Sequence, residues 1–166
     1  MAALSRRRLF GVGLGAAALA AMPALASDGK GYEANLMNCI DPRFTTFLWK
    51  YMGSRGWQDQ YSQFVVAGGP IGVVAPAFAK WQDTYWDNLA ITVQLHSIKR
   101  VVGVVHRDCG AAAVAYGDRI KTDKAYETAM STEALHQFRD GVKKRQPQLV
   151  VDLGIMDLTG AVEPVS

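Results

Sequence analysis

Beyond residue 30, short aliphatic and β-branched runs alternate with longer segments whose apolar residues are three and four positions apart. The runs predict buried strands at residues 33–39, 63–67, 100–105 and 149–155. The longer segments predict helices at residues 45–51, 77–97, 110–116 and 125–145. Residues 71–76 are apolar without a clear period, and residues 156–162 favour an edge hairpin. This alternation predicts an α/β fold with a mostly parallel sheet of about four to five strands and helices on both faces.

Residues 1–26 have the pattern of an export signal. Arginines at residues 6–8 form a twin-arginine motif, and an apolar run follows at residues 11–22. A small-residue cleavage site ends at Ala26, which predicts one mature domain at residues 27–166. An anchor that stays in the membrane is the alternative, but the apolar run is short for a span. We therefore expect a periplasmic or secreted protein with no stable membrane insertion after the signal is removed.

The leader also accounts for the basic character of the whole chain. Lys and Arg number 18 against 15 Asp and Glu, which gives a net charge of +3. The leader holds three of the arginines and none of the acidic residues, so the remaining domain is nearly neutral. A neutral domain does not favour nucleic acid as a partner. Apolar residues make up 49% of the chain, which is enough for a hydrophobic core.

Side chains suited to metal binding follow two of the predicted strands. Cys39 ends the first strand, and His106 and Cys109 follow the third. The carboxyl ends of adjacent parallel strands meet at one edge of a sheet, so these three residues are predicted to lie together. Two thiolates and an imidazole are typical zinc ligands, and three protein ligands with an open fourth position are typical of a catalytic site. The sequence therefore predicts one Zn²⁺ ion per chain.

A disulfide between Cys39 and Cys109 is the alternative, because exported proteins commonly pair their cysteines. The histidine beside Cys109 favours a metal site instead. The twin-arginine route carries folded proteins, so metal inserted in the cytoplasm would protect both thiolates from later oxidation. We favour the metal over the disulfide on these grounds.

Asp41 and Arg43 lie two and four residues after Cys39. Alternate side chains of an extended segment share one side, so Asp41 is predicted to face the metal. It could accept a hydrogen bond from a zinc-bound hydroxide, with Arg43 holding the carboxylate, or it could itself become the fourth ligand. Asp108 could orient a ligand, but a cap of the following helix is favoured. The glycines at residues 68–69 would permit a close backbone approach at the same edge.

Two motifs together resemble the β-class carbonic anhydrases. Residues 39–43 read Cys-Ile-Asp-Pro-Arg and residues 106–110 read His-Arg-Asp-Cys-Gly. The family has Cys-x-Asp-x-Arg after its first strand and His-x-x-Cys-Gly after a later one. The glycine pair at residues 68–69 and the tail at residues 150–162 are also similar to the family. The resemblance therefore extends over most of the predicted domain and identifies a small, divergent, exported member.

The resemblance implies the fold of that family, zinc on Cys39, His106 and Cys109, and a catalytic pair formed by Asp41 and Arg43. It implies a carbonate dehydratase, a lyase in which zinc-bound hydroxide reversibly hydrates carbon dioxide to bicarbonate. It also implies a homodimer or a higher homo-oligomer. A hydrolase of carbonyl sulfide or carbon disulfide on the same scaffold is one alternative. A non-catalytic protein, with zinc bound or a disulfide formed, is the other.

Overall fold

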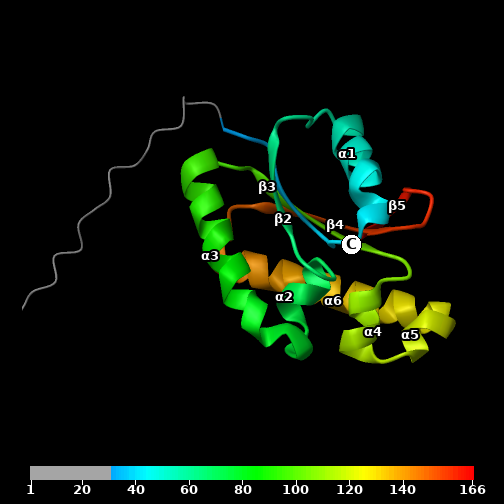
Figure 1. Cartoon of the computed structure of the whole chain (residues 1–166). Coiled ribbons are helices and arrows are strands. Elements are labelled where there is room, and N and C mark those ends of the chain that lie inside the picture. Colours follow the sequence, from blue (N-terminus) through cyan, green and yellow to red (C-terminus); the bar gives the residue numbers. More distant parts are fainter. Residues whose placement is uncertain (1–30) are drawn as a thin grey trace, which may run out of the picture.

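A five-stranded sheet forms the centre of the domain (Figure 1). The computed structural model describes residues 31–166, so the predicted leader lies outside the described residues. The strands are β1 (Ala34–Asn38), β2 (Tyr61–Val65), β3 (Arg100–His106), β4 (Val150–Met156) and β5 (Val162–Val165). They follow the order β2-β1-β3-β4-β5, with the first four parallel and β5 antiparallel to β4. The predicted α/β class is confirmed.

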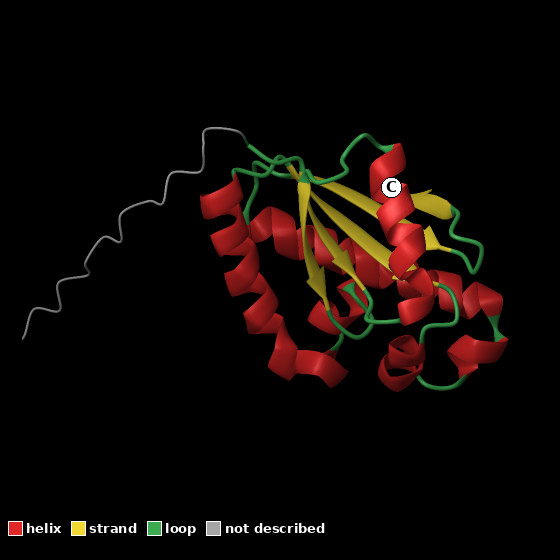
Figure 2. Ribbon diagram, turned by 45° about the horizontal axis from the view of Figure 1, so that its top comes forward, coloured by secondary structure: helices red, strands yellow, loops and turns green. Residues whose placement is uncertain are grey.

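Helices cover both faces of this sheet (Figure 2). The α-helices are α1 (Thr45–Ser54), α2 (Pro70–Val74), α3 (Ala79–His96), α4 (Gly110–Tyr116), α5 (Arg119–Thr122) and α6 (Lys124–Arg145). Two 3-10 helices, η1 (Pro42–Phe44) and η2 (Pro76–Phe78), precede α1 and α3. Across residues 31–166, none of these helices combines the length and the apolar character that crossing a membrane requires.

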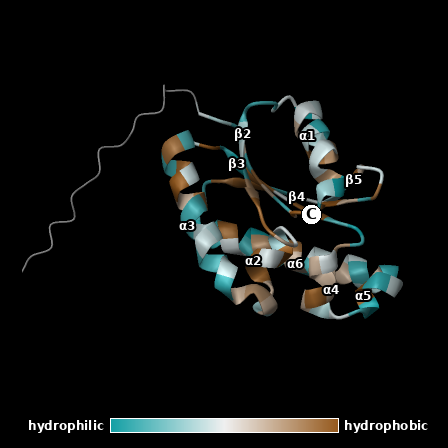
Figure 3. Cartoon of the chain, in the orientation of Figure 1, coloured by the Kyte–Doolittle hydropathy of each residue, from teal (hydrophilic) through white to brown (hydrophobic). Residues whose placement is uncertain are grey.

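Two hydrophobic clusters lie on opposite faces of the sheet because alternate strand residues point to opposite sides. Leu36 of β1 belongs to the cluster under α1, whereas the next residue, Met37, belongs to the cluster under the other helices. Figure 3 shows that hydrophobic residues gather on the strands between the helical layers. Burial on both faces explains why β3 is an almost continuous valine run.

The longest helix packs closely on the central strand because that strand contains a glycine. A Cβ atom at Gly103 of β3 would lie 2.9 Å from the ring of Phe138 on α6 and 3.2 Å from Leu153 on β4. Phe138 is fully buried. The absence of a side chain at Gly103 therefore allows α6 to lie directly against the sheet.

Two short helices depart from the sequence-based expectation. Residues predicted to be irregular form α2, and α5 lies in the interval between the helices predicted at residues 110–116 and 125–145. A helix of one turn cannot display a 3.6-residue period, although Pro70 at the start of α2 suits a first helical position. The expected edge hairpin is present, with its second strand at Val162–Val165.

Candidate metal centre

Three metal-binding side chains meet at the carboxyl edge of the sheet. Cys39 follows β1, His106 ends β3, and Cys109 immediately precedes α4. Their donor atoms all lie within 4.8 Å of one another, and all three residues are buried. The cysteines are free, and their sulfurs are 3.9 Å apart, well beyond the about 2.05 Å of a disulfide bond. The fold thus brings together the three residues selected from the sequence.

The spacing of the two sulfurs fits a tetrahedral zinc ion. Two zinc–sulfur bonds of about 2.3 Å at a tetrahedral angle place the sulfurs about 3.8 Å apart, close to the observed 3.9 Å. The Nδ1 atom of His106 lies 2.8 Å from the carbonyl oxygen of Arg107, so Nδ1 carries the proton and donates it. The Nε2 atom of His106 is buried and has no hydrogen-bond partner among the described residues. Its lone pair is therefore available to a metal.

The two sulfurs lie within hydrogen-bond distance of each other and shift each other's pKa. The hydrogen bond with Cys109 lowers the pKa of Cys39; burial opposes this shift, and contacts with His106 and the N–H of Gly68 assist it. The same hydrogen bond raises the pKa of Cys109. Burial lowers the pKa of His106, but the Cys39 sulfur, the hydrogen bond to the Arg107 carbonyl and the charge of Asp41 together outweigh it and raise that pKa. The buried negative charge on Cys39 is one that a divalent cation would neutralise.

A glycine pair brings a third loop against the first cysteine. Gly68 has a φ of +81°, and its N–H donates a hydrogen bond to the Cys39 sulfur over 3.2 Å. Gly69 has a φ of +56°, and a Cβ atom there would lie 2.9 Å from the carbonyl carbon of Asn38. Both the left-handed backbone and the close approach require glycine at residue 69.

Asp41 and Arg43 form an ion pair beside the three donors. Oδ2 of Asp41 is 2.7 Å from Nη2 of Arg43, and Oδ1 accepts the backbone N–H of Arg43 over 3.0 Å. These hydrogen bonds lower the pKa of Asp41, so the group is a carboxylate at neutral pH. Oδ2 also lies 3.9 Å from Nε2 of His106. Asp41 is therefore near the donors while Arg43 occupies both of its oxygens.

Arg43 also joins the turn after β1 to the turn after β3. Its Nη1 is 2.8 Å from Oδ2 of Asp108, and its Nη2 donates to the Asp108 carbonyl over 3.1 Å. The favoured assignment of Asp108 as a helix cap is wrong, because Cys109 holds the N-cap position of α4 and makes no side-chain cap. Asp108 adopts a φ of +57°, and its carboxylate pairs with Arg43 instead.

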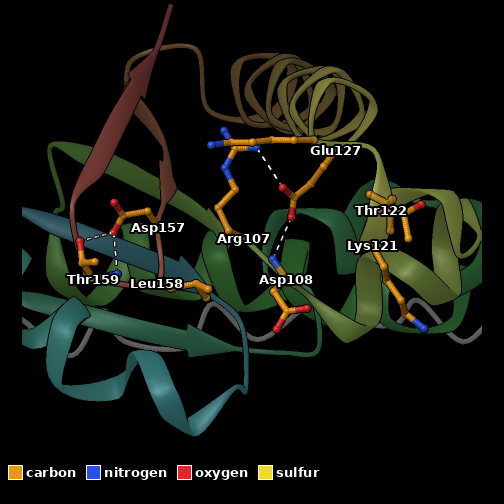
Figure 4. A pocket seen from close by; sticks show the side chains of 10 residues that line it. Arg107, Asp108, Lys121, Thr122, Glu127, Asp157, Leu158 and Thr159 are labelled. Carbon is orange, nitrogen blue, oxygen red and sulfur yellow. Dashed lines mark hydrogen bonds and ion pairs between the residues drawn. The ribbon is translucent and has the colours of Figure 1, made fainter.

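Two further residues support the site and were not predicted. The ring of Phe44 stacks on His106 with 4.0 Å between centroids. Glu127, in the first turn of α6, contacts Arg107 and Asp108 in the turn between His106 and Cys109 (Figure 4). Phe44 looks like one more apolar residue of a helical pattern, and Glu127 like one more acid on an amphipathic helix. Only the tertiary structure distinguishes them.

Comparison with known sequences yields two relatives without an assigned function. The chain is 32% identical over 130 residues to an uncharacterized protein of Rickettsia conorii, covering 78% of this chain and 70% of that protein. It is 30% identical over 130 residues to an uncharacterized protein of Rickettsia bellii, covering 78% and 79%. No family model matches the sequence.

Comparison with solved structures identifies the fold. A β-carbonic anhydrase of Trichomonas vaginalis superposes with a TM-score of 0.55 at 12% identity, covering 86% of this chain and 88% of that one. The β-carbonic anhydrase CafA of Aspergillus fumigatus superposes with a TM-score of 0.53 at 16% identity, covering 83% of this chain and 77% of that one. The resemblance seen in the sequence is confirmed at the level of the fold. The chain therefore belongs to one family with the two rickettsial proteins, and that family has a β-carbonic-anhydrase-like fold.

Proposed function

We propose that this protein is a zinc-dependent carbonic anhydrase that reversibly hydrates carbon dioxide to bicarbonate. The observation that carries the proposal is the buried group of Cys39, His106 and Cys109 beside the Asp41–Arg43 pair. Similarity in fold to solved β-carbonic anhydrases supports the same activity. When bound, zinc supplies a Lewis acid that lowers the pKa of a coordinated water to about 7.

Cys39, His106 and Cys109 would hold the ion and leave a fourth position for solvent. The proton on Nδ1 of His106, fixed by the Arg107 carbonyl, keeps Nε2 available as a ligand. The N–H of Gly68 stabilises the Cys39 thiolate through a hydrogen bond to its sulfur. These contacts would orient two of the three ligands before the metal arrives.

Asp41 would orient the attacking water by accepting a hydrogen bond from it. Hydration joins the water oxygen to the carbon of carbon dioxide and releases one proton. Arg43 lowers the pKa of Asp41, so Asp41 is a poor store for that proton and acts by orientation. The proton would leave to solvent, because Arg43, which pairs with Asp41, is half exposed. Arg43 would also keep Asp41 from closing the metal position, because it holds both carboxylate oxygens.

Zinc content and carbon dioxide hydration, measured by stopped flow on one sample, test the proposal. We expect one zinc ion per chain and a turnover that depends on it. Asp41→Asn should keep the zinc and lose about 10²- to 10⁴-fold in turnover, the usual contribution of a positioned acid or base. Asp140→Asn, the same chemical change on the exposed side of α6, should leave both values unchanged.

Other results would redirect or refute the proposal. Loss of zinc in Asp41→Asn would make Asp41 a ligand. Bound zinc with hydrolysis of carbonyl sulfide or carbon disulfide, and no hydration of carbon dioxide, would change the substrate. A metal-free protein with Cys39 bonded to Cys109 would show that the centre is a disulfide.

We also propose export by the twin-arginine route and assembly into a homodimer or higher homo-oligomer. The motif at residues 6–8 supports export, and cell fractionation after its replacement by lysines tests it. Two exposed apolar residues support assembly: Ile40, next to Cys39, and Val65, which pairs with Asn38 at the end of β2. Sedimentation of the purified protein measures the oligomer, and a monomer at all concentrations would contradict it.

A further inference from the structure

Glu127, in the first turn of α6, makes hydrogen bonds to the turn between His106 and Cys109. From this contact we infer that Glu127 is a positioning residue, which holds the turn in the geometry that presents both ligands to the metal. The inference rests on the proposed metal site and adds to it a residue that contacts neither metal nor substrate.

Both oxygens of Glu127 are used on this turn. Oε1 accepts the backbone N–H of Asp108 over 2.8 Å, and Oε2 lies 3.2 Å from Nη1 of Arg107 (Figure 4). The side chains of Glu127 and Arg107 are only 12% and 14% exposed. Hydrogen bonds to charged groups at such depth are stronger than those of surface ion pairs. One carboxylate thus fixes the two residues that separate the ligands.

The backbone of the turn needs such a partner. Asp108 has a φ of +57°, a conformation that non-glycine residues rarely adopt. Its N–H lies outside the hydrogen bonds of α4, which begins at Gly110. Among the described residues, Glu127 is the acceptor that this N–H reaches. Without that acceptor, the Asp108 N–H would lose its partner in the protein and the left-handed conformation would lose this support.

Packing does not replace this contact, because a cavity lies against the same side of the turn. Its volume is about 430 Å³, and its walls include Arg107, Asp108, Glu127 and Leu158. Figure 4 shows Arg107 and Glu127 on one side of this space and the residues after β4 on the other. The turn therefore faces open space here, and polar contacts rather than side-chain packing determine its position.

The test compares the zinc affinities of E127A, E127Q and E133A by competition with a chelator. Partners of metal ligands typically contribute about 10- to 100-fold to affinity, and we expect E127A to lose that much. E127Q keeps an oxygen that can accept the Asp108 N–H, so it should restore most of the affinity. E133A, an exposed change on the same helix, should bind zinc as the unmodified protein does.

Two further readouts separate positioning from general stability. In metal-free protein, amide hydrogen exchange at Asp108 and Cys109 should be faster in E127A while the sheet stays protected. With Co²⁺ in place of zinc, the visible spectrum of E127A should show altered ligand geometry that E127Q restores. These signals respond to the shape of the turn and do not require turnover.

Equal zinc affinity in E127A and E133A would overturn the inference. So would an equal loss in E127A and E127Q that accompanies faster exchange throughout the sheet, because Glu127 would then be only structural. If the unmodified protein binds no zinc, the proposed function fails. Exchange at Asp108 and Cys109 then decides whether Glu127 holds the turn.

Discussion

The turn after β1 and the turn after β3 each bring one sulfur to the same centre, but they are held in different ways. The first is held by an ion pair between Asp41 and Arg43, two positions apart, and by close backbone packing of Gly69 against Asn38. The second contains the left-handed Asp108, whose N–H is bound by Glu127, 19 residues along the chain.

This difference shows that the two turns of the proposed metal site depend on two kinds of support. Close contact between main chains positions Cys39, so the first turn should be sensitive to added atoms. A remote carboxylate supports the residues before Cys109, so the second turn should be sensitive to the loss of a polar partner. Arg43 links the two turns through Asp41 and Asp108.

Removing either sulfur should produce the largest loss of zinc affinity, and the loss should be similar for the two turns. Serine is a much weaker zinc ligand than thiolate, so Cys39→Ser and Cys109→Ser should each lose more than about 100-fold in zinc affinity. This loss exceeds the about 10- to 100-fold expected when only a partner of a ligand is removed. Competition with a chelator measures this loss. If one variant kept its zinc while the other lost it, the missing effect would exclude that cysteine as a ligand.

Adding one methyl group should affect the first turn through its backbone. Gly69→Ala places a Cβ atom 2.9 Å from Asn38 at a φ of +56°, which should cost about 1–3 kcal/mol of unfolding free energy. Denaturant unfolding of the metal-free protein measures the change.

Gly53→Ala is the matched control for this substitution. The nearest atom to its added Cβ is a side-chain oxygen of Gln58 at 3.7 Å, and the residue lies within α1. Helix propensity should make this change neutral or stabilising by up to about 1 kcal/mol. Equal stability of the two variants would show that the loop of Gly69 moves aside without penalty.

Neutralising the exposed link between the turns should have the smallest effect. Asp108→Asn removes the charge that faces Arg43, but asparagine tolerates the left-handed backbone. Both side chains of this pair are about half exposed, and exposed pairs contribute little to stability. We expect the melting temperature to change by less than about 2 °C, with zinc content and turnover retained. A large loss of turnover would instead assign the Asp108 charge a role in the site.

The fold and the metal-binding residues follow from local sequence signals. Short apolar runs followed by cysteine or histidine place Cys39, His106 and Cys109 at one sheet edge, since parallel strands align their carboxyl ends. The pairing of Asp41 with Arg43 follows from their spacing. Each of these inferences needs only residues close in sequence and the general geometry of a parallel sheet.

What supports the ligands was not predictable in the same way. The contact of Glu127 with Asp108 depends on how α6 crosses the sheet, and its sequence context resembles that of other acids on this helix. Asp108 looked like a helix cap because its left-handed conformation is not visible in the sequence. The single turn of α2 is too short for hydrophobic periodicity to reveal it.

Gly103 connects the interior of the domain with the metal site. The middle of α6 rests where β3 lacks a side chain, and the same helix carries Glu127 in its first turn. A methyl group at Gly103 would collide with Phe138 and displace α6 from the sheet. This shift should move Glu127, in the first turn of α6, away from the turn between His106 and Cys109. The close packing of α6 on β3 at Gly103, three residues before His106, thus bears on the position of the helix that holds the turn between His106 and Cys109.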